Sequence, residues 1–353
     1  MQRKTAKDKM SDDKKMKTGF FLLFFTLLFQ VTARWITGFA AFYARYIYPI
    51  FVGTLGRFSG IFPVSLTELG LYLLIVWVFA ELVRNYRKPL LLVKRICFVC
   101  SVLFFSYTVN CGINYFTSPF SFYAGIETGL YSTEELKELC QYLVEQVNAN
   151  VSEVHYKDQS QEWKREGVRA MQRLGAEFDC LSGFYPMPKD LLVDEILSVQ
   201  QLCGVYAPFT IEANFNGDMP DYNIPHTICH ELSHLKGFMY EDEANFIGYL
   251  ACIMSENQAF RYSGYLTGWV YAGNALARAD GEAFRELHSQ LDARAVKHLQ
   301  ENNDFWDRYE GKVAEAANQM NDTYLKINRQ EDGVKSYGRM VDLMLASRRK
   351  TAK

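Results

Sequence analysis

Three long apolar segments constrain the fold of this chain more than any other feature. Residues 19–39, 66–83 and 96–115 are mainly apolar, and each has about the length that a helix needs to cross a bilayer. The first contains Arg34 near its far edge, where a long side chain can reach the interface. We therefore expect three transmembrane helices in a membrane domain over residues 19–115.

The first apolar segment has an alternative interpretation. It follows a Lys-rich leader, and a cleaved signal peptide has the same order of a basic region and an apolar core. No small-x-small cleavage site follows it, however, and the apolar stretch is longer than a usual signal core. An uncleaved membrane anchor is therefore the favoured interpretation.

Positive charges predict how the chain is oriented in the membrane. Residues 1–18 form a basic tail, and the short loop 84–95 carries five basic residues. Because cytoplasmic loops carry an excess of Lys and Arg, both segments should be cytoplasmic, and three crossings then place residues 116–353 outside. The aromatic loop 43–67 either lies along the membrane surface or is a plain connection.

The remaining chain, residues 116–353, has the periodicity of one mostly helical extracytoplasmic domain. Ser132 begins a Ser-x-x-Glu capping box ahead of apolar residues at helical spacing. Further helices are expected over 161–175, over 190–202 and through most of 240–324, whereas Ala207–Asn214 alternates like a strand. The expected fold class is mainly α (α+β), with a small β element.

Charge and cysteine content exclude several classes of protein. The formal net charge of -2 argues against a strongly basic nucleic-acid-binding protein. Three of the eight cysteines lie in the third apolar segment and are expected to pack as small apolar residues. The other five lack CxxC spacing, so no cysteine zinc site is expected. Free thiols are favoured over a Cys180–Cys203 disulfide.

One motif carries the chemistry of the chain, His230-Glu231-Leu232-Ser233-His234. Residues four apart lie on one face of a helix, so both imidazoles can reach one metal ion while Glu231 approaches a metal-bound water. Zinc suits such a site, because its catalytic sites use three protein ligands and leave a position for water. Glu231 is then the expected general base.

The third metal ligand is expected from the next helix. Gly237 can end the first helix in a left-handed conformation, and the chain continues into an acidic helix start after a short turn. Glu241 is favoured, because Asn245 one turn later can orient a histidine. Glu243 is the alternative, since a short turn can bring a slightly later residue nearer to the metal.

These motifs also resemble a known group of proteins. The HExxH helix followed by E-x-x-A-N resembles the gluzincin metallopeptidases. Three spans with IPHTICHELSHLKGFMYEDEANFIGYLAC and a later GVKSYG segment resemble an uncharacterised bacterial family of membrane-anchored, gluzincin-like proteins. This resemblance implies a zincin-like domain with Zn²⁺ at His230, His234 and a Glu of the 241–243 pair, and Glu231 as catalytic base. The connection between His234 and Glu241 is shorter than in better-studied gluzincins.

Other residues have weaker expected roles. His226 follows Pro225 at the start of the helix and is expected to be structural. Tyr337 and Tyr262 are candidate donors to the oxyanion of a tetrahedral intermediate, and Ala207–Asn214 is the candidate edge strand for substrate. The remaining histidines lack partnered spacing and are expected at the surface: His155, His288 and His298.

The sequence thus predicts a membrane-anchored zinc metallopeptidase in the cell membrane, acting on a peptide or protein substrate outside the cytoplasm. Glu231 would deprotonate the attacking water and pass the proton to the leaving amine. The main alternative is a metal-binding membrane sensor or scaffold without general proteolytic activity. A transport component is disfavoured, because no charge lies in the middle of any apolar segment.

Overall fold

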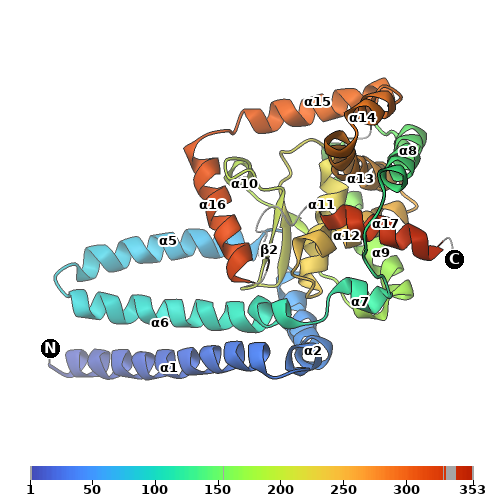
Figure 1. The fold of residues 1–353 in the computed structure, drawn as a ribbon. Helices are drawn as coiled ribbons and strands as arrows, with labels where there is room; N and C mark the ends of the chain where they lie inside the picture. Colours follow the sequence, from blue (N-terminus) through green and yellow to red (C-terminus); the bar gives the residue numbers. More distant parts are fainter. Residues whose placement is uncertain (1, 154, 329, 331–338, 352–353) are drawn as a thin grey trace.

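The computed structural model describes residues 2–153, 155–328, 330 and 339–351. It is mainly helical with one small sheet, as the sequence predicts. Figure 1 shows three long helices that extend from one side of a compact helical domain. These are α1 (Gln2–Trp35), α5 (Leu66–Asn85) and α6 (Pro89–Tyr107), and all three are long and apolar enough to cross a membrane.

The third membrane helix begins earlier than predicted. It starts at Pro89 rather than near residue 96, with proline at the first helical position, where its missing N–H costs nothing. Arg95 pairs with Glu81 of α5 at 2.9 Å, and Lys94 pairs with Asp13 of α1 at 3.5 Å. These partners neutralise two charges that the sequence assigns to a cytoplasmic loop. Its far end, η3 (Thr108–Gly112), is buried against the domain.

Short helical pieces connect the first two membrane helices. They turn within the aromatic loop 43–67, and several of their apolar side chains are exposed, Phe42, Tyr46, Ile50 and Phe58 among them. The pieces are α2 (Phe39–Phe42), η1 (Tyr43–Ile47), α3 (Tyr48–Phe51), η2 (Val52–Gly56) and α4 (Arg57–Ser59).

The domain beyond the membrane helices is built from helices around a small sheet. Ser132 caps α8 through the predicted capping box with Glu135. In chain order the elements are η4 (Asn114–Phe116), α7 (Phe120–Ala124), α8 (Thr133–Asn150), α9 (Tyr156–Glu177), η5 (Asp179–Leu181), β1 (Lys189–Asp190), α10 (Glu195–Ser198), β2 (Gly204–Ala207), β3 (Glu212–Phe215), α11 (Asn223–Leu235), α12 (Glu241–Ile253), α13 (Gln258–Ala279), α14 (Gly281–His288), α15 (Ala293–Asp307), α16 (Lys312–Ile327) and α17 (Met340–Thr351).

Two predictions of secondary structure are wrong. Residues 190–202 form only the short helix α10, because the Asp194 carboxylate accepts the backbone N–H groups of Leu191 and Gly217 and fixes a loop there. The segment 207–214 is not one strand: it holds the end of β2, a turn over residues 208–211 with Ile211 at a φ of 54°, and most of β3. The sheet has the order β1-β3-β2, so β2 is an edge strand.

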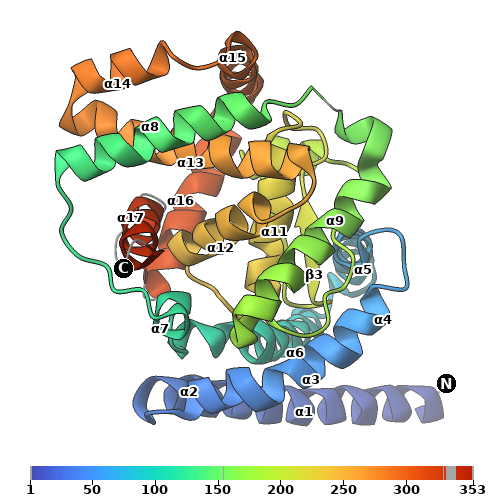
Figure 2. The same cartoon turned by 90° about the vertical axis from the view of Figure 1, so that its right-hand side faces the viewer.

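Helix α11 occupies the centre of this domain. Figure 2 shows α9, α12 and α13 around it, with β3 on a neighbouring side. Its apolar side chains Ile224, Ile228, Leu232 and Leu235 are completely buried, and their spacing is that of a helix packed on a core. Any side chain that α11 directs toward the sheet therefore has a fixed position.

A buried ion pair joins the sheet to the second membrane helix. Lys189 of β1 and Glu212 of β3 form a salt bridge and are both almost fully buried. The Lys189 ammonium donates to the carbonyl oxygens of Ser59 and Val64. The Glu212 carboxylate accepts the N–H groups of residues 66 and 67 at the start of α5. This pair therefore holds the membrane helix in place on the domain.

We expect Lys189→Met to lower the free energy of unfolding by about 3–5 kcal/mol, because it leaves the Glu212 charge buried without its partner. Lys297→Met is the matched control. Its ion pair with Glu301 is exposed, so the change should stay below about 1 kcal/mol. Denaturant unfolding of the full-length protein in detergent measures both values, and equal losses would contradict the structural role of the buried pair.

Candidate metal centre

The predicted motif lies on the buried face of α11. His230 and His234 are each 8% exposed and Glu231 is 4% exposed. The helix forms because the motif is embedded in apolar residues at helical spacing, and Pro225 lies in its first turn, where a missing N–H costs nothing. Two imidazoles one turn apart therefore point into the interior of the domain.

A tight turn brings α12 back along α11. Gly237 has a φ of 98°, the left-handed conformation that glycine adopts without strain, and it ends α11 as the sequence predicts. The two helices then approach so closely that a Cβ on Gly248 would lie 3.2 Å from the backbone nitrogen of His230. This close packing carries the start of α12 to the imidazoles.

Three potential ligand atoms converge between the two helices. The Nε2 atoms of His230 and His234 are 3.0 Å apart, and the Glu241 Oε2 atom lies 3.2 Å from the first and 3.6 Å from the second. All ligand atoms of this cluster lie within 4.8 Å of one another. The Glu241 carboxylate thus lies where the predicted third metal ligand is expected.

The alternative ligand, Glu243, lies elsewhere. Its carboxylate accepts hydrogen bonds from the backbone N–H groups of Phe120 at 2.7 Å and Ser121 at 3.1 Å, and from the Ser121 hydroxyl. Those donors hold the start of α7 against α12. Glu243 therefore joins two helices and does not enter the cluster of ligand atoms.

The outer nitrogens of both histidines are fixed by oxygen acceptors. His230 Nδ1 lies 2.9 Å from Asn245 Oδ1, and His234 Nδ1 lies 2.8 Å from the Phe238 carbonyl oxygen. A carbonyl oxygen only accepts, so each Nδ1 carries a proton, and the Nε2 atoms are the nitrogens that can bind a metal ion. Asn245 is the histidine-orienting residue that the sequence predicts.

These residues fit a divalent zinc ion. Ligand nitrogens at about 2.0–2.1 Å from zinc in a tetrahedron are about 3.3–3.4 Å apart, close to the separations of 3.0, 3.2 and 3.6 Å among these three groups. A carboxylate and two imidazole nitrogens directed at one point favour positive charge there: burial lowers the pKa of His234, but the neighbouring Glu241 raises it to about 9. Two imidazoles with one carboxylate are also a frequent donor set for catalytic zinc.

Glu231 lies beside the cluster without joining it. Its Oε2 atom is buried and has no hydrogen-bond partner in the part of the chain that the structure describes. Burial raises the pKa of Glu231 to about 7, although His230 and His234 lower it. By contrast, the same two histidines hold the pKa of Glu241 well below its usual range, even though burial acts in the opposite direction.

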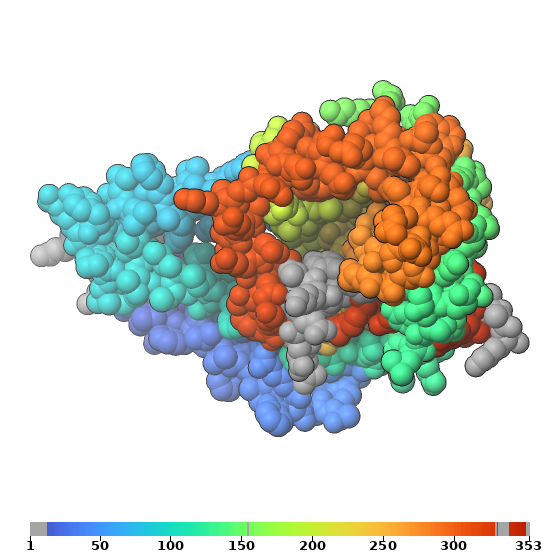
Figure 3. Space-filling view, turned by 45° about the horizontal axis from the view of Figure 1, so that its top comes forward, coloured from blue at the N-terminus to red at the C-terminus, as the bar shows by residue number. Residues whose placement is uncertain are grey.

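A large cavity opens onto the cluster. It has a volume of about 960 Å³ and is lined by the three potential ligands, by Glu231 and by β2. Figure 3 shows the molecule hollowed between α15 and α16, with residues near 200–215 at the base of the hollow. The cavity therefore leads from this face to the two histidines.

The edge strand β2 runs past Glu231. Asn216 donates its N–H to the Cys203 carbonyl oxygen, so by alternation the backbone groups of Gly204 and Tyr206 point away from β3. Both residues line the cavity. A Cβ on Gly204 would lie 2.6 Å from Glu231 Oε1, so only glycine fits beside this carboxylate.

One of the two predicted oxyanion donors lies away from this cavity. The Tyr262 hydroxyl lies 2.7 Å from His298 Nδ1, and Tyr262 lines a separate cavity of about 460 Å³, so it does not face the three potential ligands. Tyr337 lies outside the described residues. Tyr271 of α13, which sequence reasoning missed, lines the large cavity. The spacing of Tyr271 from other tyrosines in the sequence does not indicate that it reaches the cavity.

The other histidines have partners that the sequence does not indicate. His226 Nε2 lies 3.0 Å from the Asn245 carbonyl oxygen, which agrees with the expected structural role. His155 is exposed and pairs with Asp221, and His298 is bonded to Tyr262 rather than lying free at the surface. His288 is half-buried and lines the large cavity.

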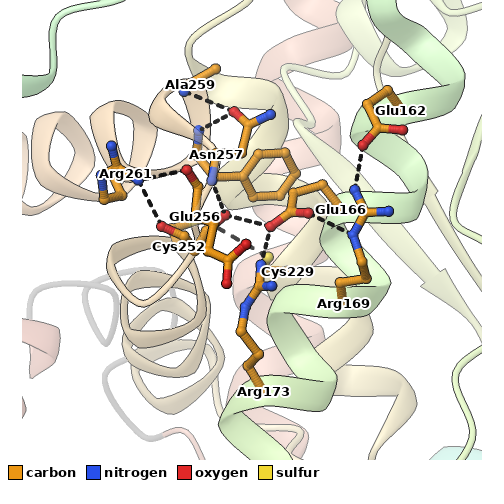
Figure 4. A network of polar contacts seen from close by, with 12 residues as sticks. Glu162, Glu166, Arg169, Arg173, Cys229, Cys252, Glu256, Asn257, Ala259 and Arg261 are labelled. Atoms are coloured by element: carbon orange, nitrogen blue, oxygen red, sulfur yellow. Dashed lines mark hydrogen bonds and ion pairs between the residues drawn. The ribbon is translucent and has the colours of Figure 1, made fainter.

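A second polar network supports α11 and α12 from the side away from the cavity. Figure 4 shows Glu166 of α9 bonded to Arg169 and Arg173, and it also accepts from Ser255 just beyond α12. The thiols of Cys229 and Cys252 are 3.9 Å apart in the same region. All eight cysteines are free in the structure, so Cys180 and Cys203 form no disulfide.

A comparison with known families shows which family the chain belongs to. The family model described as a protein of unknown function (DUF3810) matches residues 43–345, which include two membrane helices and the whole cavity. The chain belongs to the DUF3810 family. No curated protein and no solved structure matches this DUF3810 chain.

Two variants separate the roles of the neighbouring acids. We expect Glu241→Gln to reduce the zinc content of the purified full-length protein at least tenfold, because a ligand is lost. Glu243→Gln should keep zinc near one ion per chain, because its carboxylate bonds to α7. Elemental analysis by mass spectrometry after dialysis measures both, and equal zinc in the two variants would contradict the assignment of Glu241.

Proposed function

We propose that this DUF3810 protein is a membrane-anchored zinc-dependent peptidase. The observation that carries the proposal is the arrangement of four side chains. His230, His234 and Glu241 present three metal-binding atoms at one point, and Glu231 lies buried beside them with an unpartnered oxygen. The same four residue types, at this spacing, resemble the gluzincin metallopeptidases.

The chemistry divides between the metal and the chain. When bound, zinc supplies a Lewis acid that polarises a carbonyl and lowers the pKa of water to about 7. Glu231 accepts the proton of the attacking water on its free carboxylate oxygen and returns it to the leaving amine. Asn245 and the Phe238 carbonyl keep the two imidazoles oriented, as outer partners do in metal sites.

The edge strand supports a polypeptide substrate. An extended peptide can pair with the outward backbone groups of Gly204. The missing side chain of Gly204 gives the Glu231 carboxylate room beside the strand, where the Tyr206 backbone N–H faces it. Tyr271 supplies a donor in the same cavity. Burial, with smaller effects of Cys203 and Glu241, raises the pKa of Tyr271 above its usual range, so its hydroxyl keeps the proton that it would donate to an oxyanion.

A structural site without hydrolysis is the second candidate. A sensor or scaffold would need the metal ligands but not Glu231. A buried carboxylate oxygen without a hydrogen-bond partner costs stability, and nothing in a structural zinc site compensates for that cost. The unpartnered oxygen of Glu231 therefore favours the peptidase over the scaffold.

Glu231→Gln tests the proposal directly. We expect the variant to keep its zinc, because Glu231 is not a ligand, and to lose at least 10²-fold in hydrolysis, because the general base is lost. Cells carrying the wild type or the variant are compared for new protein N-termini in the membrane and outside it. Glu256→Gln, a change at an exposed position, is the control.

The outcome separates the two candidates. Wild-type-specific N-termini that are absent with Glu231→Gln and present with Glu256→Gln would support the peptidase. Identical N-termini in all three strains, together with bound zinc, would support the sensor or scaffold instead.

We also propose that the domain lies outside the cytoplasm. Basic residues in the first half of α1, ahead of its apolar part, and around the connection of α5 to α6 follow the positive-inside rule, and three crossings then leave the domain on the far side. A periplasm-active reporter fused after residue 353 should be active, whereas a reporter active only in the cytoplasm should be silent. The reverse pattern would contradict this orientation.

A further inference from the structure

Helix α16 forms one wall of the cavity. Ala317, Asn318, Asn321 and Tyr324 all line it, and their spacing places them on one side of the helix. Lys312, Glu315 and Lys326 lie on the opposite side and are exposed. This helix therefore separates the cavity from its surroundings.

A third side of α16 is apolar and exposed. Val313, Met320 and Ile327 are 59%, 74% and 65% exposed. They follow one another at intervals of seven residues, close to two helical turns, so they form one stripe along the helix. The stripe lies between the cavity side and the charged side, an arrangement typical of helices at a membrane surface.

The end of α16 rests on the outer end of the third membrane helix. The Tyr324 ring lies 6.2 Å from the Tyr107 ring and 6.1 Å from the Tyr115 ring, and the Tyr115 and Tyr324 hydroxyls are 3.0 Å apart. The Tyr107 hydroxyl also donates to Asn328 Oδ1 at 3.2 Å. Tyrosines gather in this way where a membrane helix leaves the bilayer.

The position of α16 in the fold agrees with a membrane contact. Figure 1 shows α16 on the side of the domain from which α5 and α6 extend, running crosswise to them. A helix that lies crosswise to membrane-spanning helices, at their outer end, lies along the membrane surface. The third membrane helix also has apolar side chains exposed near this end, with Phe104 40% exposed.

The membrane helix itself contributes to the cavity. Tyr107, Cys111 and Tyr115 line it together with α16 and the metal-binding residues. The lining of the cavity therefore runs from the membrane surface to Glu231. A polypeptide held in the membrane can enter it without leaving the surface.

We propose that the apolar stripe of α16 lies in the lipid and that the cavity takes its substrates from the membrane surface. The substrate class is then the membrane-anchored polypeptide, cut in a segment close to its anchor. The substrate part of this inference rests on the proposed peptidase function. The lipid contact of α16 does not.

Lipid contact is tested first, without any need for activity. A fluorescent amino acid replaces Met320 or, as control, Glu315 in the full-length protein, which is placed in phosphatidylcholine vesicles with a spin-labelled lipid as quencher. We expect quenching at position 320 at least twofold stronger than at position 315. Equal quenching at the two positions would overturn the contact.

The substrate class is tested with the same vesicles. A mixture of peptides of varied sequence is offered either with a lipid anchor at one end or without it, and cleavage that Glu231→Gln abolishes is counted. We expect the anchored mixture to be cut at least tenfold faster, and Met320→Gln to reduce that preference while Glu315→Gln keeps it.

The possible results distinguish the substrate class, the peptidase function and the lipid contact. Equal cleavage of anchored and free peptides would overturn the substrate class and leave the peptidase in place. No cleavage that depends on Glu231 would contradict the peptidase itself, and quenching at position 320 would then still decide whether α16 contacts lipid.

Discussion

The close antiparallel packing of α11 and α12 is the constraint on which the site depends. Two glycines allow it: Gly237 turns the chain in a left-handed conformation, and Gly248 lets the second helix lie against the backbone of His230. Glu241 and Asn245 reach the two imidazoles only because the helices are so near. A connection of six residues between His234 and Glu241 therefore suffices to build a cluster of three ligand atoms, where a looser packing would need a longer one.

The membrane segments are hydrogen-bonded to the elements that carry the site. The Tyr48 hydroxyl, from the connection between α1 and α5, lies 2.8 Å from the Tyr206 hydroxyl of β2 and donates to the Leu235 carbonyl oxygen at the end of α11. The Tyr206 hydroxyl also donates to the Asn110 carbonyl oxygen, just past α6. The edge strand and the motif helix are thus both bonded to the membrane part, so the anchor positions the site as well as holding the domain at the membrane.

Local patterns account for what the sequence predicts correctly. The three membrane helices, the capping box at Ser132, the helix that carries His230 and the left-handed Gly237 each depend on residues within a few turns of one another. Glu241 was predictable for the same reason, since one short turn connects it to His234. Asn245 followed from its spacing of four residues from Glu241.

Packing between distant parts of the chain determines the positions that the sequence did not predict. Gly204 and Tyr271 reach the cavity from β2 and α13, and no local spacing relates them to the motif. Tyr262 has an equally suitable sequence environment, yet His298 holds it in another cavity. The single strand predicted over 207–214 is divided between two strands by a turn, because alternation of side chains does not reveal a left-handed residue at Ile211.

Zinc K-edge X-ray absorption of the wild-type, full-length protein tests the central claim most directly. The account predicts a first shell of nitrogen and oxygen atoms at about 2.0–2.2 Å, with the multiple scattering of two imidazoles and no sulfur. A sulfur shell at about 2.3 Å, or a protein that takes up no zinc, would contradict the metal centre of His230, His234 and Glu241.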